Sequence, residues 1–360
     1  MKLARIPCRM NVRRPTLFPQ LAHCGMRTSL HSLIGSLLIA ALLAAGPAHA
    51  QDSDELANAL SSIGQQYATN YTRPVTDALG ADMNAGLFRT AAFEETGLVP
   101  GIDVYVGASV MGAFTAGSPD SFRLDNDEFT INTGASTQTL RIEYPNTDLP
   151  TAFGDNDSPG MADIVDTDTD TKVGEVTLPG AIISTSIAPL VVPQVGVGTV
   201  LGTDAQLRYL PETGYNDYGT ISLFGVAVRH NLSQYIPLFP ANIAVQGAWQ
   251  RVTLSGREDS RNPGEVVDAS GWALNAQASK DLPVLPVTIY GGVQYEKFGV
   301  DVKYTFTSNG QTATFTYEQD AANSVRALAG LTLSLKILRV NVDYALSSNN
   351  TVSAGVGLVL

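Results

Sequence analysis

Cysteine is absent from most of this 360-residue chain, since Cys8 and Cys24 both lie near its start. Histidine is almost absent as well, and His230 is the only histidine after residue 50. Disulfides, cysteine nucleophiles and thiolate metal sites all need cysteine, so none is expected beyond residue 24. His230 has no metal-ligand cluster or nucleophile motif near it in the sequence. We therefore expect no enzyme, no metal site and no cofactor.

Long apolar runs are missing too. The run from Leu33 to Ala45 has 13 residues, whereas a membrane-spanning helix needs about 20. Ala48-His49-Ala50 follows this run and matches the small-residue pattern at which secretory signals are cleaved. We expect residues 1–50 to be a signal peptide that is removed. Met26 is the expected true start, because a signal of ordinary size begins there.

Basic side chains are scarce in the part that would remain. Residues 1–50 contain six of the 22 basic residues and none of the 34 acidic ones, which leaves 16 basic against 34 acidic residues and a net charge of −18. Proteins that bind nucleic acid contact its phosphates with lysine and arginine. Nucleic acid is therefore not an expected partner of this chain.

Alternation of apolar and polar residues fills the last stretch of the chain, residues 324–360. Apolar residues such as Val325 and Leu331 occupy odd positions, and polar residues such as Arg326 occupy even ones. From Val340 onward the apolar residues occupy even positions instead, as a short hairpin loop requires. Period-2 alternation over about ten residues, repeated through hairpins, is typical of a transmembrane β-barrel. A soluble β-sandwich also alternates. The final apolar row favours the barrel, because it resembles the assembly signal of outer-membrane barrels; the signal residues are Leu358 and Leu360.

The same alternation predicts the extent of the barrel. It occurs at residues 102–114, the first clear strand, and is regular from Asp204 onward. We count eight strands from the strand that contains Tyr209 onward and roughly four before it. We predict an all-β, antiparallel transmembrane barrel of about 12 strands over residues 101–360, with roughly 10 to 14 allowed. The run 181–201, interrupted by Pro189 and Pro193, is either a kinked strand or an inward fold. Aromatic residues expected at the membrane interfaces are Trp249, Trp272, Tyr290, Tyr295 and Tyr344.

Residues 51–100 have a helical pattern instead. Asp52 and Glu55 resemble a capping box at the start of a helix. We expect this segment to plug the periplasmic mouth of the barrel, because it has an apolar stripe that needs burial. A loose leader is the alternative. The expected plug contacts are the stripe residues Leu56, Leu60 and Ile63 and, facing the acidic start of the segment, Lys336 and Arg339.

Charged residues on the polar rows are candidate lumen-lining residues. They either line a selectivity path or form ion pairs that fill a narrow lumen. The candidates are Arg208, Arg229, Glu296, Arg326 and Asp343.

An acidic stretch lies between Asp148 and Asp170. Its Asp166-Thr-Asp168-Thr-Asp170 spacing resembles the start of a calcium loop but lacks the glycine and the distal glutamate of an EF-hand. We expect a solvated extracellular loop, and calcium binding stays open. His230 is expected to lie at a membrane interface.

A signal peptide, a helical leader and a medium-sized barrel together resemble the long-chain fatty-acid transporter (FadL-type) outer-membrane family. The layout is still more similar to an uncharacterised group of barrels, for which no activity is implied. The resemblance to the FadL-type family implies a plugged lumen and hydrophobic cargo that leaves sideways through a strand kink. We predict an outer-membrane barrel for passive transport of small hydrophobic molecules. The alternative is a structural or adhesive barrel with acidic surface loops. Expected partners are outer-membrane lipid, the barrel assembly machinery and hydrophobic small molecules.

Overall fold

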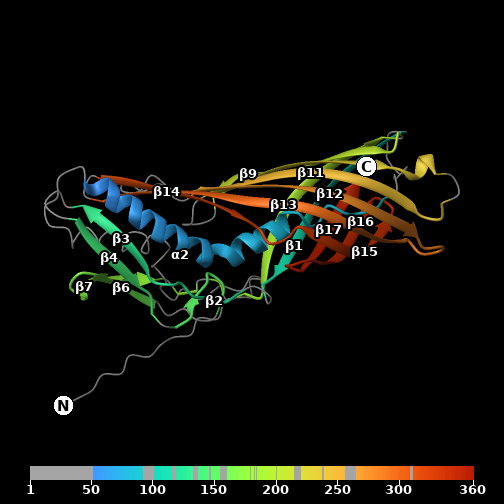
Figure 1. Ribbon diagram of the computed structural model, residues 1–360. Helices are drawn as coiled ribbons and strands as arrows, with labels where there is room; N and C mark the ends of the chain where they lie inside the picture. The colour runs from blue at the N-terminus through green and yellow to red at the C-terminus, as the bar shows by residue number, and fades with distance from the viewer. Residues whose placement is uncertain are drawn as a thin grey trace, which may run out of the picture.

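The computed structural model describes most of the chain after the expected signal peptide. It covers residues 52–360 apart from 92–100, 116–118, 133–136, 146, 155–159, 179, 182, 184, 200, 215–219, 237–238, 256–264 and 309–310. Figure 1 shows a barrel at one end of an elongated molecule and a smaller group of strands at the other, with one long helix running between them.

Ten antiparallel strands among the described residues close into the barrel wall, because β12 pairs with β13 and β1 pairs with β17. In wall order they are β1 (Ile102–Phe114), β8 (Ile187–Thr199), β9 (Thr203–Gly214), β10 (Thr220–Asn231), β11 (Asn242–Ser255), β12 (Glu265–Asp281), β13 (Val287–Ser308), β15 (Val325–Leu335), β16 (Leu338–Leu346) and β17 (Thr351–Val359). The predicted all-β antiparallel barrel is confirmed. The count of about 12 is wrong, because only β1 and β8 precede β9 in the wall.

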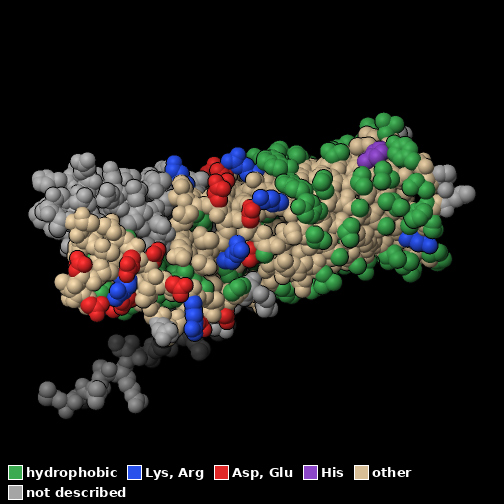
Figure 2. Space-filling view, viewed as in Figure 1, with side chains coloured by type: hydrophobic (Ala, Val, Ile, Leu, Met, Phe, Trp, Pro, Cys, Tyr) green, Lys and Arg blue, Asp and Glu red, His purple; other side chains and the backbone are tan. Residues whose placement is uncertain are grey.

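The wall has an apolar outer face and a polar inner face. Val325 is 61% exposed while its neighbour Arg326 is 1% exposed, and the same alternation holds along the other wall strands. Figure 2 shows hydrophobic side chains gathered over the barrel and charged ones over the opposite end. A strand that has lipid on one side and a filled lumen on the other must expose every second side chain and bury the ones between. The predicted faces are therefore confirmed.

Aromatic side chains project from the wall near one level. Trp249 and Trp272 are register partners on β11 and β12, and Trp272 packs edge-on against Tyr295 at 5.4 Å. Tyr344 of β16, two strands along the wall from β13, is 44% exposed. Tyr290, the remaining candidate, is not among them. Its side chain points into the lumen, where its parity on β13 places it.

The two ends of the barrel differ in their connections. At the end where the chain terminates, which we call the turn end, β15 and β16 are joined through Lys336 and Ile337 alone. Lys336 adopts a positive φ of 53°, which allows that tight turn. The opposite end, which we call the head end, carries the 72 residues between Phe114 and Ile187. The longest connection of the barrel thus lies at the head end.

A small head is built at the head end from the connection between β1 and β8. Its strands form one four-stranded and one two-stranded sheet, and β14 extends beside it as the partner of the outer half of β13. The strands are β2 (Ser121–Phe122), β3 (Asp127–Asn132), β4 (Thr137–Glu143), β5 (Leu149–Pro150), β6 (Gly160–Asp166), β7 (Thr171–Leu178) and β14 (Gln311–Asp320); a short 3-10 helix, η2 (Ser233–Tyr235), lies at the turn end. The acidic stretch is thus a folded part of the head rather than a simple loop.

Helix α2 (Asp52–Met83) links the head to the lumen. It is one continuous helix with Pro74 inside it. Its residues Tyr67 and Tyr71 stack at 5.8 Å, and Tyr67 also contacts Phe122 of β2 at 5.4 Å. None of the described helices is long and apolar enough to cross a membrane.

Candidate functional site

The lumen is occupied by the plug segment, which we define as residues 78–91, the end of α2 and the stretch after it. Wall side chains bind the backbone carbonyls of this segment at several points. The donors and their acceptor carbonyls are Arg326 to Ala81 (2.8 Å), Arg208 to Met83 (3.2 Å) and Ala85 (2.9 Å), Gln250 to Met83, Gln294 to Asn84 (2.9 Å), Thr332 to Arg89, and Asn231 to Ala91 (2.9 Å). Such charge-assisted and amide hydrogen bonds from several strands fix the segment in place.

A turn inside the plug segment depends on glycine. Gly86 has a φ of +63°, a conformation that other residues adopt only with strain. A Cβ atom there would lie 3.1 Å from Met111 Sδ and 3.3 Å from an Arg208 guanidinium nitrogen. A side chain at this position would therefore be strained by the backbone conformation and would require small shifts of Met111 and Arg208.

The most buried ion pair of the described residues lies beside the plug segment. Arg326 donates to both oxygens of Glu296, at 3.0 and 2.8 Å, and both side chains are 1% exposed. A third bond joins Arg326 to Thr351 of β17 at 2.9 Å. Removing one partner of such a pair leaves an uncompensated charge in the interior.

Arg208 binds differently, since its described partners are carbonyl and amide oxygens. It reaches Gln250 at 2.9 Å in addition to the two plug carbonyls. Near the turn end Arg229 instead pairs with Asp204, and across the lumen Asp343 accepts a bond from Tyr290 at 2.8 Å. All five candidate lumen-lining residues, Arg208, Arg229, Glu296, Arg326 and Asp343, thus point inward and are buried.

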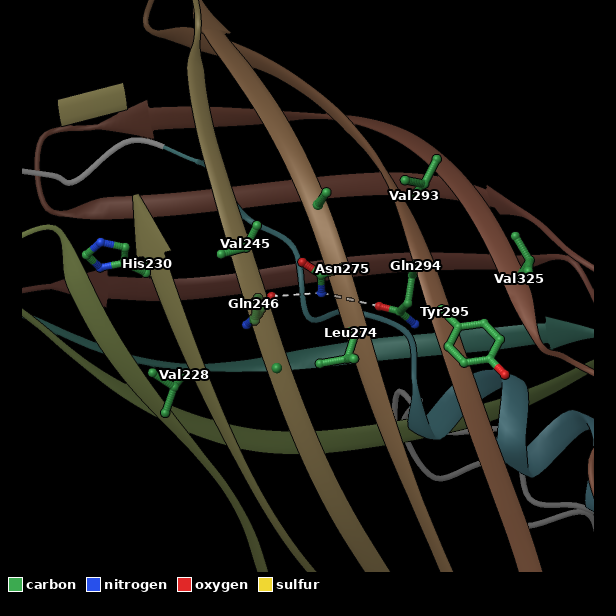
Figure 3. Close-up of a pocket in the computed structure, with 12 residues that line it drawn as sticks. Val228, His230, Val245, Gln246, Leu274, Asn275, Val293, Gln294, Tyr295 and Val325 are labelled. Atoms are coloured by element: carbon green, nitrogen blue, oxygen red, sulfur yellow. Dashed lines mark hydrogen bonds between the residues drawn. The ribbon is translucent and has the colours of Figure 1, made fainter. Parts of the chain in front are cut away.

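Uncharged amide side chains make up a row that the sequence reading missed. Asn275 donates to Gln246 at 3.1 Å and to Gln294 at 3.4 Å, so the row crosses β11, β12 and β13 on their inner face. Figure 3 shows these bonds behind the outward side chains of the same strands. The available signal was glutamine or asparagine recurring at inward positions of neighbouring strands, which a search for charged residues overlooks.

The predicted plug contacts fall elsewhere. Lys336 and Arg339 lie at the turn end, where Arg339 donates to the Lys336 carbonyl at 2.8 Å. Helix α2 begins in the head at the opposite end, so the expected meeting with its acidic start is wrong. The backbone of Leu56, Leu60 and Ile63 lies in the head part of α2, and their side chains are outside the described residues.

Different apolar residues fill the lumen instead. Leu87 and Phe88 of the plug segment pack with Tyr290 and, from the wall, Leu328. Leu328 broke the alternation of its strand in the sequence, and its inward contact explains why. A single apolar residue on a polar row was therefore a usable sign of a filled lumen.

The terminal residues Leu358 and Leu360 lie on the outer face of the wall and are 42% and 38% exposed. Leu360 also exchanges backbone hydrogen bonds with Val104 of β1, at 2.8 and 3.3 Å. The last residue of the chain therefore takes part in closing the ring. The role of Leu358 and Leu360 as an assembly signal stays a prediction.

The wall is incompletely paired between β8 and β9. Backbone pairing joins these strands through five residue pairs, the last of which is Gln194 with Arg208. Beyond that pair, as far as the described residues go, residues 187–193 of β8 pair with β1 alone and residues 209–214 of β9 with β10 alone. We call this unpaired half the open seam.

Proline accounts for the place where the pairing ends. Proline has no backbone N–H, so it is found in sheets mainly at edges and bulges. Pro189 and Pro193 lie on the open side of β8, and pairing with β9 starts at the next residue, Gln194. On β9, Pro211 lies where its register against β10 shifts. The run that the sequence left undecided is thus a strand with one unpaired edge.

An apolar cluster lies on the inner side of the open seam. Leu190 of β8 and Leu210 of β9 pack against a core that includes Met83 of the plug segment, Val192 and Leu223. The outward neighbours Val191 and Tyr209 are 54% and 53% exposed. Apolar surface is therefore continuous from the outer face, across the open seam, to the plug segment.

A shallow groove of about 540 Å³ crosses the outer face of β10 to β13. Small residues such as Gly247 and Ala276 form its floor, and Val245, Leu274 and Val293 are among its walls (Figure 3). His230 lies at its turn-end margin and bonds Thr203 at 2.7 Å and Tyr235 at 3.1 Å. Among the described residues, the hydrogen-bond partners of His230 are Thr203, Tyr235 and Gln234, none of which is a carboxylate.

The acidic turn of the head is held by hydrogen bonds to the carboxylate of Asp166. Asp166 accepts bonds from the backbone N–H groups of Asp168 and Thr169, at 3.0 and 2.9 Å, and from the Gln138 side chain. The bond from Gln138, followed by that from the Thr169 N–H, lowers the pKa of Asp166. The described residues hold no cluster of three metal-ligating side chains. The aspartate spacing is explained by this turn, and calcium binding stays untested.

A family model described as "Family of unknown function (DUF6588)" matches residues 26–360. Among curated proteins, none matches the sequence. The resemblance to the FadL-type family is not confirmed by these matches and stays a prediction.

Several solved barrel structures are distantly similar. The translocator domain of the autotransporter NalP from Neisseria meningitidis is 11% identical, with 86% of this chain and 99% of that chain covered and a TM-score of 0.27. OmpT, an outer membrane protein of Vibrio cholerae, is 10% identical, with 72% and 99% covered and a TM-score of 0.23. The transport unit of AIDA-I from Escherichia coli is 11% identical, with 81% and 98% covered and a TM-score of 0.24. At these TM-scores the similarities carry no argument about function.

Proposed function

We propose that this chain, which belongs to the DUF6588 family of unknown function, is an outer-membrane barrel that passes small hydrophobic molecules sideways through the open seam. Passage is passive and involves no catalysis and no cofactor. Outer-membrane lipid surrounds the apolar face, and the barrel assembly machinery is the expected partner for insertion. The observation that carries the proposal is the end of the β8–β9 ladder at Gln194 and Arg208, with apolar side chains on both sides of the unpaired stretch.

The lumen itself offers a poor route for such molecules. Towards the turn end it holds the plug segment, whose carbonyls are bound by wall side chains, and the amide row beside it. A hydrophobic molecule would have to displace these hydrogen bonds without replacing them, and each buried polar group left unpaired costs about 1–3 kcal/mol. The open seam lies on the other side, where Leu190, Leu210 and Val192 need no such displacement.

A disulfide across the open seam tests the proposal. Extending the β8–β9 register by two residues places Val192 opposite Leu210, so V192C/L210C should form a bond under oxidation. V195C/L207C is the matched control, because this pair already faces across the closed half. Residues 51–360 contain no cysteine that would interfere.

The measured quantity is the rate at which the hydrophobic dye N-phenylnaphthylamine enters the membrane of cells that express each variant. We expect oxidation to slow dye entry several-fold in V192C/L210C, to leave V195C/L207C unchanged, and to be reversed by a reductant. Dye entry that is equal with the open seam locked and unlocked would exclude the lateral route.

The head favours a second candidate, a surface anchor for adhesion. Segments far apart in the sequence build it, since Tyr71 of α2 donates to the Gly180 carbonyl at 2.9 Å and its own carbonyl accepts from Ala152. Its acidic side chains Asp168 and Asp170 are exposed. An anchor of this kind needs an ordered, charged head and makes no use of the open seam.

Adhesion of expressing cells to polylysine-coated glass separates the two candidates. The variant D168N/D170N removes two exposed negative charges and leaves Asp166, which closes the turn, in place. If the protein is an adhesive anchor, the variant should reduce adhesion and leave dye entry unchanged. Unchanged adhesion together with a seam-dependent dye entry would favour transport alone.

A further inference from the structure

The chain runs through the lumen from the head end to the turn end before the first wall strand begins. In the head, Thr76 bonds Gln319 of β14 at 2.8 Å. Further along, Ala91 bonds Ser279 at 3.0 Å and Asn231 at 2.9 Å, and these residues lie near the turn-end limits of β12 and β10. Strand β1 then begins at the turn end and returns towards the head (Figure 1).

This path places the start of α2 on the opposite side of the membrane from the chain terminus. Barrels of the outer membrane have short periplasmic connections and long outer ones. By that rule the turn end is periplasmic and the head end is outside. Helix α2 has 32 residues, or roughly 48 Å of helix. Secretion through a signal peptide delivers the same residues to the periplasm, so they must cross the membrane plane.

We propose that the barrel is the passage for its own N-terminal segment, which is threaded through the lumen so that the start of α2 lies outside the cell. The inference is independent of what the open seam does. The polypeptide that passes through the lumen is then a part of the chain itself, unfolded and about as long as α2.

The chemistry of the lumen wall suits a polypeptide in transit. Six wall side chains donate hydrogen bonds to carbonyl oxygens of the plug segment, among them Arg208, Arg326 and Asn231. Every peptide unit presents the same carbonyl, so such donors can bind successive residues whatever their side chains. The donors occur from Arg326, near the head end, to Asn231, near the turn end, which gives a passing chain contacts along the whole lumen.

Single cysteines test the final topology. Gln65 is exposed on the head part of α2, Ser348 is exposed in the β16–β17 connection at the head end, and Val284 is fully exposed in the β12–β13 connection at the turn end. Intact cells that express Q65C, S348C or V284C are treated with a membrane-impermeant maleimide, and the label is compared before and after the outer membrane is opened. The heat-dependent gel shift of each variant reports whether its barrel has folded, and Q66C replaces Q65C if that variant does not fold.

We expect Q65C and S348C to be labelled in intact cells and V284C only after opening. Labelling of Q65C together with V284C, and not with S348C, would overturn the inference.

A fusion distinguishes threading from assembly around the segment. A stably folded, cysteine-free domain placed before Asp52 should abolish outside labelling of Q65C, because a ten-stranded lumen is too narrow for it. An unfolded variant of the same domain should restore labelling, and equal labelling with both fusions would exclude threading through the lumen.

Discussion

Between β11 and β12 the backbone ladder runs unbroken from Asn242 to Ser255, whereas between β8 and β9 it stops after five residue pairs at Gln194. The material behind the two seams differs as well. Amide side chains bonded to one another and to the plug segment lie behind part of the first, and one apolar cluster lies both behind the second and behind Val252 and Ala269 of the first. An apolar interior alone therefore does not end the backbone pairing, and the prolines of β8 mark the place where it ends. One wall thus combines a fully paired, sealed side that is backed in part by amides with a half-paired side that is backed by apolar residues.

The largest expected effect comes from breaking the polar side. The variant E296A leaves Arg326 buried without its carboxylate partner, which should lower the free energy of unfolding by about 3–5 kcal/mol. The measurement is urea unfolding of the purified barrel in detergent, with E318A on an exposed position of β14 as the control. The double variant E296L/R326M should recover part of the loss, because it removes both buried charges. Equal stability of E296A and E318A would contradict this account of the sealed side.

The wall could be predicted from the sequence because parity is a local property. An apolar outer face and a filled lumen impose the period-2 pattern residue by residue, so Val325 and Arg326 were assigned correctly. The connection from Phe114 to Ile187 could not be placed, since strands of a head and strands of a wall look alike when both alternate. Two strands too many were therefore counted for the barrel.

The interior was less predictable because its contacts join distant residues. Arg326 and Glu296 were each identified as inward, but their pairing depends on the β13–β15 register and not on their spacing. The entry side of α2 was assigned wrongly for a related reason. The apolar stripe of the helix indicates that this face must be buried, but it contains no information about which end of the barrel buries it. Pro189 and Pro193 were noticed, but the unpaired edge they create was visible only in the strand pairing.

A cavity on the apolar side should have the next largest effect. The variant L223A removes a buried side chain from the cluster behind the open seam. Large-to-small changes in packed cores cost about 2–5 kcal/mol, and the value here should lie at the low end because the unpaired strands can move inward. Urea unfolding measures it, with the outward change L207A as the control. A cost above that of E296A would mean that the apolar side is the more rigidly packed one.

Alkaline pH should loosen the head that joins β1 to β8 above the open seam. Burial raises the pKa of Tyr71 to about 12, from about 10 in an unfolded chain. The neutral phenol is therefore the form that the fold favours, and its contribution to stability is complete below pH 10 and is lost as the pH rises towards 12. Burial also raises the pKa of Tyr67 and Tyr144. Ultraviolet absorbance of tyrosinate and protease cutting of the head should change together over this range, while the gel shift of the barrel persists. Y71F should weaken the absorbance change, and loss of the barrel at the same pH would show that the two regions do not melt separately.

The smallest expected effect comes from completing the unpaired ladder. Replacing Pro193 by valine restores a backbone N–H beside Gln194, the residue at which the β8–β9 pairing begins. One additional backbone hydrogen bond is worth about 0.5–1.5 kcal/mol, and valine suits an outward strand position. We expect P193V to be slightly more stable than the parent and to admit N-phenylnaphthylamine more slowly, because the open seam is shorter. P286V, at the turn end next to the first residue of β13, is the control for losing a proline without closing the open seam. A P193V variant that gains stability but keeps the parent's rate of dye entry would separate the pairing defect from transport. If P193V and P286V slow dye entry equally, the difference between the two sides of the wall has no role in permeation.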